Sequence, residues 1–171
     1  GMEGGHALAK ILLGKVNPSG KLAYTFPKRL EDCPAHSIGE FPGSDTVSYG
    51  EGVFVGYRYY ETQQIPVRYC FGHGLSYTSF AYRDLAVEKR ENGFQVSLKV
   101  SNTGEREGKE TVQVYVKAAG KTIPRPVKEL RSFSKVRLLP KETRQLSFFL
   151  EMQAFSCYSE EEKIYCAGRL L

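Results

Sequence analysis

Regular alternation of apolar and polar residues in the second half of this 171-residue chain is the feature that most limits its fold. Neighbouring side chains of a strand point to opposite faces, so alternation indicates one buried face and one face in water. Four segments show this pattern: residues 80–87, 93–100, 110–116 and 143–150. Turn sequences separate them at 91–93, 102–105 and 139–142. Short strands at this spacing predict an antiparallel β-sandwich that begins near Tyr77.

Residues 3–13 predict an amphipathic helix ahead of the sandwich. Leu8, Ile11 and Leu12 share one face at helical spacing, and Gly14 is a natural C-terminal cap. One helix and a few strands do not complete a layered α/β domain. We therefore expect this apolar face to be exposed, and residues 1–76 to be marginally stable on their own.

The stretch between the helix and the sandwich carries weaker signals. Residues 22–26 predict a strand that Pro27 ends. Residues 28–48 are rich in Pro, Gly, Ser and Asp without periodicity, and they predict a long loop. Residues 53–60 are β-branched and aromatic, which fits either a strand or a short helix.

Charge and hydropathy argue against two classes of partner. The net charge is +5 and the isoelectric point about 9.0, but the basic residues are interspersed with acidic ones and form no run of five. This distribution favours a mixed-charge surface over nucleic-acid binding. No stretch approaches the roughly 18 consecutive apolar residues of a membrane-spanning helix, so no membrane partner is expected.

Four cysteines, at positions 33, 70, 157 and 166, are irregularly spaced and form no C-x-x-C motif. This spacing predicts neither a zinc site nor a thioredoxin-like motif. Free thiols in a reducing compartment are the favoured interpretation, which implies a cytoplasmic location. A disulfide between Cys157 and Cys166 across a hairpin is the less favoured alternative.

No motif identifies a metal, a cofactor or a catalytic group. The three histidines, His6, His36 and His73, lack metal-ligand spacing, and His73 is interpreted as a hydrogen-bonding turn residue. The chain has no G-x-S-x-G elbow and no glycine-rich phosphate-binding fingerprint. The first half carries six carboxylates that spacing alone cannot pair: Glu3, Asp32, Glu40, Asp45, Glu51 and Glu61. Surface positions and caps are their favoured roles, and Glu3 suits the positive end of the helix dipole.

Aromatic residues crowd the middle of the chain: Tyr49, Phe54, Tyr57, Tyr59, Tyr60, Tyr69 and Phe71. Exposed aromatic rings can stack on sugar rings, and aromatic residues also bury large areas where two domains meet. Packing between domains is the favoured interpretation, and contact with a sugar is the alternative.

Several local strings, in the same order, resemble the family 3 glycoside hydrolases. GMEGGHALA (1–9), LGKVNPSGKL (13–22), YGEGVFVGYRYY (49–60) and FGHGLSYT (71–78) resemble the closing part of the α/β-sandwich domain. NTG (102–104), VQVYV (112–116) and RPVKEL (125–130) resemble the fibronectin type III-like domain that follows. The expected fold is therefore α+β overall and mainly β. It comprises a remnant of the α/β domain over residues 1–76 and an immunoglobulin-like sandwich over residues 77–171. The sandwich is expected to lack its last strand, which would begin where the chain stops, at residues 167–171.

The resemblance implies a retaining exo-β-glycosidase, most often a β-glucosidase, that hydrolyses terminal β-linked sugars. In the family an Asp on an N-terminal TIM-type barrel is the nucleophile, and a Glu in the earlier part of the α/β domain is the acid/base. Neither motif has a counterpart here, so no catalytic, cofactor-binding or metal-binding residue is assigned. The substrate-binding residues stay unknown, and the chain alone is expected to be inactive.

Three roles are compatible with these observations. The favoured one is a structural C-terminal region whose partner is the rest of the glycosidase, joined in cis or in trans. The alternatives are a stand-alone carbohydrate-binding or protein-interaction module, and one chain of a split glycosidase.

Overall fold

The computed structural model describes residues 2–39, 41–117, 125–159 and 164–167, with the backbone alone at 159 and 164–167. These residues form two compact units. The sandwich unit comprises Gly1–Lys21, Gly74–Val114 and Ser132–Met152, and the loop unit comprises Leu22–His73, Tyr115–Arg131 and Gln153–Leu171.

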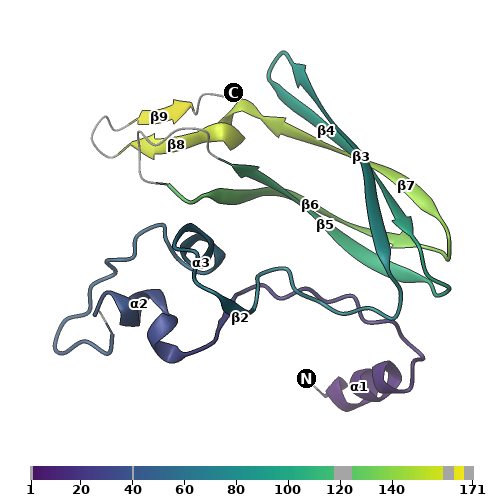
Figure 1. Cartoon of the computed structure of the whole chain (residues 1–171), viewed down its shortest axis with the longest axis horizontal. Helices are drawn as coiled ribbons and strands as arrows, with labels where there is room; N and C mark the ends of the chain where they lie inside the picture. The colour runs from purple at the N-terminus through teal and green to yellow at the C-terminus, as the bar shows by residue number, and fades with distance from the viewer. Residues whose placement is uncertain (1, 40, 118–124, 160–163, 168–171) are drawn as a thin grey trace. The chain divides into compact units, whose positions relative to one another are not determined.

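The elements follow one another as α1 (Gly4–Leu12), β1 (Phe26–Pro27), η1 (Leu30–Asp32), α2 (Pro34–Ser37), α3 (Tyr57–Thr62), β2 (Val67–Tyr69), β3 (Phe80–Arg90), β4 (Gly93–Asn102), β5 (Gly108–Lys117), β6 (Lys128–Leu138), β7 (Thr143–Glu151), η2 (Met152–Phe155), β8 (Ser156–Ser159) and β9 (Ile164–Ala167) (Figure 1). The structure is thus mainly β with a few short helices, as the sequence predicts. No helix among the described residues is long and apolar enough to span a membrane.

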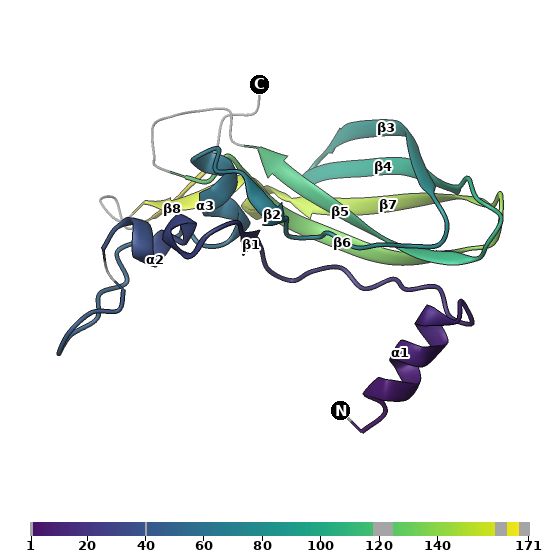
Figure 2. The same cartoon turned by 60° about the horizontal axis from the view of Figure 1, so that its bottom comes forward.

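The sandwich unit has two antiparallel layers. One is the sheet β3-β4-β7, and the other is formed by β5 and β6 (Figure 2). Alternate residues of β4 are buried, as the pattern of residues 93–100 predicts: Val96, Leu98 and Val100. They share the core with Val112, Val136, Leu138, Phe148 and Leu150 from the other strands. The alternating pattern was sufficient to predict the buried face of β4, because burial of one face maintains the register of a strand.

Strand β6 was not predicted from the sequence. Its second half alternates, with Val136 and Leu138 buried. Its first half carries Lys128, Glu129 and Arg131, which do not give an apolar face. These charged side chains instead find partners in the loop unit, which the local sequence does not reveal.

The predicted helix of residues 3–13 is observed as α1, Gly4–Leu12, and no residue of it is buried. Leu8 and Leu12 are exposed and Ile11 is half-buried. Gly14 has a φ of +69°, and its N–H donates to Ile11 O at 2.8 Å, as expected of a glycine after a helix end. The predicted exposure of this apolar face is therefore confirmed for Leu8 and Leu12, whereas Ile11 is partly covered.

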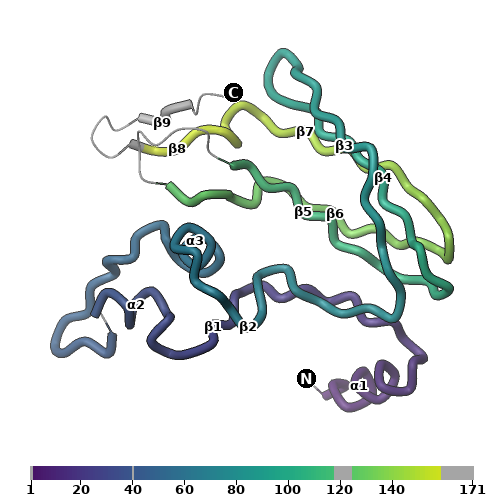
Figure 3. Tube along the Cα trace, in the orientation of Figure 1, coloured from purple at the N-terminus to yellow at the C-terminus, as the bar shows by residue number. Residues whose placement is uncertain are grey.

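The loop unit differs from the prediction in detail. The five-residue strand at 22–26 is wrong, because only Phe26–Pro27 pairs with β2, and Pro27 lies within this edge strand. Leu22 instead exchanges backbone hydrogen bonds with Gly72 and His73, each at 2.8 Å. The loop at 28–48 contains the short helices η1 and α2, and the ambiguous segment becomes helical from Tyr57 onward. The tube view in Figure 3 follows the path of the chain through these segments.

The sandwich core gives a direct test of stability. Leu138, which is fully buried, should lose about 2–5 kcal/mol of unfolding free energy on substitution by alanine, because a cavity remains in a packed core. Phe133→Ala, on the same strand but 67 % exposed, should cost about 0.5 kcal/mol or less. Urea unfolding followed by tyrosine fluorescence would measure both. Equal losses for the two variants would contradict the assignment of Leu138 to the buried face of β6 and of Phe133 to the exposed one.

Candidate functional site

Five of the six candidate carboxylates lie among the described residues, and their surroundings differ. Glu3 and His6 are exposed and paired with each other at 2.8 Å, which uses the Glu3 carboxylate in a surface contact. Asp32 accepts a hydrogen bond from Arg29 N at 3.2 Å and caps the turn η1. Asp45 is exposed.

Of the remaining three, Glu61 pairs with Lys128 at 2.8 Å. Glu51 has a buried Oε2 without a hydrogen-bond partner. Glu40 lies outside the described residues. Among the described carboxylates, Glu3, Asp32 and Glu61 are paired with basic side chains. A glycosidase acid/base pair would instead have two carboxyl groups facing one sugar. The absence of a catalytic residue from this chain stays a prediction.

The histidines lie against aromatic rings or exposed acids. The ring centroid of His36 is 4.9 Å from that of Phe41, and His73 is 5.0 Å from Tyr69. The backbone N–H of His73 donates to Cys70 O at 3.0 Å, which agrees with a role in the turn. Within the described ranges, no three His, Cys, Asp or Glu residues are grouped as metal ligands would be.

The cysteines differ in their surroundings. Cys33 and Cys70 are free, and the Cys33 thiol neighbours the Tyr60 hydroxyl. Burial, reinforced by this thiol, raises the pKa of Tyr60 above its ordinary value. Strands β8 and β9 place Cys157 opposite Cys166 in register, but the side chain of Cys166 lies outside the described residues.

The tyrosines pack mainly within the loop unit. The ring of Tyr57 lies 4.9 Å from Phe71 and 5.8 Å from Tyr115, and its hydroxyl accepts a hydrogen bond from Leu130 N at 2.8 Å. Tyr57 therefore connects the helix α3 to residues that follow in β5 and β6. Tyr49, in contrast, is exposed.

A cavity of about 300 Å³ lies beside this aromatic group. It is lined by Thr25, Tyr57, Tyr60, Glu61, Gln64, Ile65, Val67 and Cys70. The Thr25 hydroxyl is buried without a partner. Two aromatic rings with a few polar groups around a small cavity are common in ligand sites, but Tyr60 is almost fully buried and offers no free ring face.

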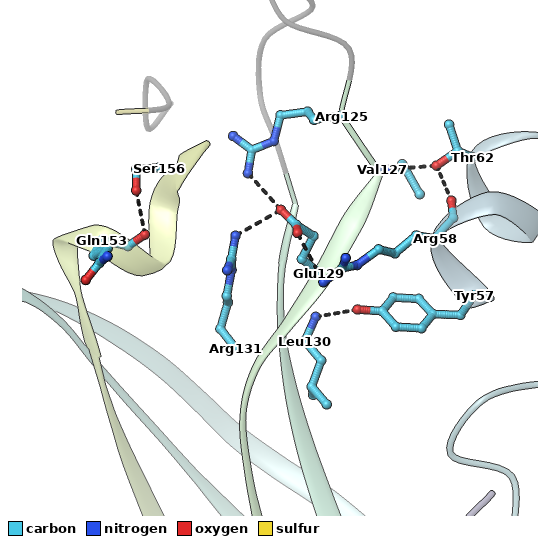
Figure 4. Close-up of polar contacts among 10 residues, drawn as sticks. All are labelled: Tyr57, Arg58, Thr62, Arg125, Val127, Glu129, Leu130, Arg131, Gln153 and Ser156. Carbon is cyan, nitrogen blue, oxygen red and sulfur yellow. Dashed lines mark hydrogen bonds and ion pairs between the residues drawn. The ribbon is translucent and has the colours of Figure 1, made fainter. Parts of the chain in front are cut away.

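Charged groups gather around one carboxylate, Glu129, near α3 (Figure 4). Glu129 Oε2 accepts hydrogen bonds from Arg131 Nη2 at 2.9 Å and from Arg125 Nη2 at 3.2 Å. Its Oε1 lies 3.5 Å from Arg58 Nη2. We call these four residues the arginine cluster. Glu129 and Arg131 are two positions apart on β6 and so project to the same face, which Arg58 reaches from α3.

Burial and neighbouring charge also affect Tyr115, whose ring meets that of Tyr57 edge to face. Burial is the main cause that raises its pKa to about 12, and the nearby Tyr57, Glu61 and Cys70 add to it. The ammonium of Lys128 lies 4.8 Å from the centre of its ring, a cation–π distance. The neutral phenol is thus favoured in the folded chain.

The sequence analysis missed the arginine cluster. Its members come from residues 58, 125, 129 and 131, and no local spacing brings Arg58 to the others. The spacing of Glu129 and Arg131 could have shown part of the cluster, because residues two apart on a strand project to the same face. That strand, β6, was not predicted from the sequence. The carboxylate of the cluster, Glu129, is engaged by the three arginines.

Comparison with known proteins identifies the region. The glycosyl hydrolase family 3 C-terminal domain matches residues 1–77, and the fibronectin type III-like domain matches residues 110–168. The thermostable beta-glucosidase B of Acetivibrio thermocellus is 49 % identical over 164 residues, which are 93 % of this chain and 22 % of that protein.

Solved structures agree in fold. The GH3 beta-glucosidase of Bifidobacterium adolescentis superimposes with a TM-score of 0.89 at 44 % identity, over 95 % of this chain and 24 % of that one. Beta-glucosidase 3B of Thermotoga neapolitana, solved with glucose, gives 0.84 at 40 % identity, over 90 % of this chain and 22 % of that one. The chain spans less than a quarter of the length of each of these proteins.

The arginine cluster leads us to expect a large loss of stability when the charge of Glu129 is removed. Glu129→Gln should lower the unfolding free energy by about 3–5 kcal/mol, because it leaves buried guanidinium groups without their carboxylate. Glu61→Gln, in the more exposed pair with Lys128, is the matched control and should cost about 1 kcal/mol or less. Thermal and urea unfolding of the two variants would provide the comparison. A loss for Glu129→Gln no larger than for the control would show that the cluster does not stabilise the loop unit.

Proposed function

The chain belongs to the family 3 glycoside hydrolases, and we propose that it serves as the non-catalytic C-terminal region of a retaining exo-β-glycosidase that hydrolyses terminal β-linked sugars. The nucleophile and the acid/base would then be supplied from outside these 171 residues. The partner of the chain would be the rest of that glycosidase, with its TIM-type barrel and the earlier part of its α/β domain. The ordered match of two family domains supports this proposal.

The single observation that carries the proposal is the state of α1. A nine-residue helix is marginal in water unless an apolar face packs against other residues. Here Leu8 and Leu12 are exposed, the latter at 73 %, and no residue of the helix is buried. At its C-terminal end, Tyr77 OH donates a hydrogen bond to Ile11 O at 2.7 Å. Such a helix is what a region covered by further protein would show.

The relatives supply the identity of that covering protein. In each, the matched region is less than a quarter of a longer β-glucosidase. We therefore assign the occupant of the α1 face to the remainder of a family 3 enzyme. A division between the two domains near residue 76 is part of this proposal, supported by the extent of the first family match.

A cytoplasmic location accompanies the proposal. The free thiols Cys33 and Cys70 support a reducing compartment, because secreted domains of this size commonly pair their cysteines. Thiol titration of freshly isolated protein would report directly on this point.

Hydrogen exchange on the chain tests the uncovered helix. We expect the α1 amides to exchange much faster than those of β4 and β7, because the helix buries no side chain whereas those strands pair with each other over nine residues. Mass-spectrometric exchange with peptide resolution would show the difference, and β4 serves as the internal control. Strong, uniform protection across residues 1–50 would overturn the proposed docking face.

An activity assay tests the missing chemistry. The purified chain should release no product from an aryl β-glucoside above the rate without protein. A retaining mechanism uses a pair of carboxyl groups, and neither family motif that supplies them has a counterpart in this sequence. The beta-glucosidase of Bifidobacterium adolescentis, assayed in parallel, is the positive control. Turnover by the chain would contradict a non-catalytic role and favour a complete site within it.

A further inference from the structure

We propose that the arginine cluster is a binding site for a second oxyanion, of the carboxylate or phosphate type. Three guanidinium groups surround one carboxylate, so two positive charges remain after Glu129 is counted. The nearby Lys128 and Glu61 neutralise each other and do not change this balance. Among the residues that the structure describes, Glu129 is the only carboxylate in an ion pair with these three arginines.

The excess charge is held away from water. The side chain of Arg125 is 10 % exposed and that of Glu129 is 13 % exposed. Removing a guanidinium group from water is unfavourable unless charge and hydrogen bonds compensate for it. Glu129 cannot compensate for three such groups, because one oxygen already accepts from two arginines and the other lies at a long 3.5 Å from Arg58.

The hydrogen-bond donors of the cluster are also incompletely used. The Nε–H groups of Arg125 and Arg131 are buried and have no acceptor. Buried charged donors without partners are uncommon, and each is unfavourable to folding. A site that retains two of them, with Arg125 nine-tenths buried, is organised to stabilise more negative charge than it contains.

The geometry provides an accessible edge. Arg58 is 35 % exposed and Arg131 is 25 % exposed, so an incoming anion can contact these two groups. Arg125 is only 10 % exposed and adds its charge through a medium of low polarity. The planar donors of arginine match the oxygens of carboxylates and phosphates, which defines the class of ligand.

Neighbouring contacts fix the position of the cluster. Val127 N donates to Thr62 Oγ1 at 3.1 Å, and Leu130 N donates to Tyr57 OH at 2.8 Å. Both bonds join the start of β6 to α3, which carries Arg58 (Figure 4). The arginines are therefore held together before any ligand arrives, which reduces the entropy lost on binding.

Titration of the 171-residue chain with inorganic phosphate tests the site. We expect saturable shifts of the Nε–Hε resonances of Arg125 and Arg131, at ionic strength held constant with sodium chloride. Arg58→Gln removes the most exposed donor and should weaken binding about tenfold, the effect of one hydrogen bond between charged groups. Arg68→Gln, which removes the same charge from an exposed position on β2, is the matched control and should bind phosphate like the unmodified chain.

Folding of each variant is checked by its amide spectrum, and Arg131→Lys replaces Arg58→Gln if the latter unfolds. Acetate distinguishes the source of the anion. Acetate binding comparable to phosphate indicates a protein side-chain carboxylate, whereas a strong preference for phosphate indicates a free phosphate group. The proposal is overturned if phosphate causes no saturable shift, or if Arg58→Gln and Arg68→Gln bind phosphate equally well.

Discussion

The sandwich unit depends on one buried amide, that of Asn102 at the end of β4. Asn102 is 1 % exposed, and all of its polar atoms are bonded. Its Nδ2 donates to Arg106 O at 2.7 Å and to Leu138 O at 3.2 Å, while its Oδ1 accepts from Thr78 Oγ1 at 2.6 Å and Gly104 N at 3.1 Å. Because a buried amide is tolerated only when satisfied, the turn after β4, the end of β6 and the start of β3 are fixed together.

The attachment of α1 follows from that turn. Asn17 donates to Glu107 O at 2.9 Å and accepts from Tyr77 N at 2.8 Å and Ser76 Oγ at 3.0 Å. The residues after the helix are therefore held to the sandwich unit by backbone and amide groups. No apolar side chain of the helix is buried in the process. These hydrogen bonds fix the position of the residues that follow α1. The helix itself gains no stability from apolar burial, because its apolar face is uncovered.

The loop unit is organised by charge and aromatic packing in place of a large aliphatic core. Helix α3 contributes Tyr57 to the aromatic group and Arg58 to the arginine cluster, and both meet residues of β6. The three arginines of the cluster share one carboxylate, and no residue of α1 in the sandwich unit is buried. Both features are consistent with the proposed role as a region of a larger enzyme.

The sequence by itself determined the strands whose apolar residues alternate, the helix with its glycine cap, and the family through its ordered motifs. Each of these is a local property of consecutive residues, so the pattern alone was informative. Tertiary structure alone decided that residues 57–62 are helical, that β6 is a strand despite its charged first half, and that Arg58 meets Glu129. These outcomes depend on partners about 70 residues apart, and the free energy of an ion pair or a ring contact is set by that distant partner and its burial. The spacing of residues along the chain indicates neither the distant partner nor its burial.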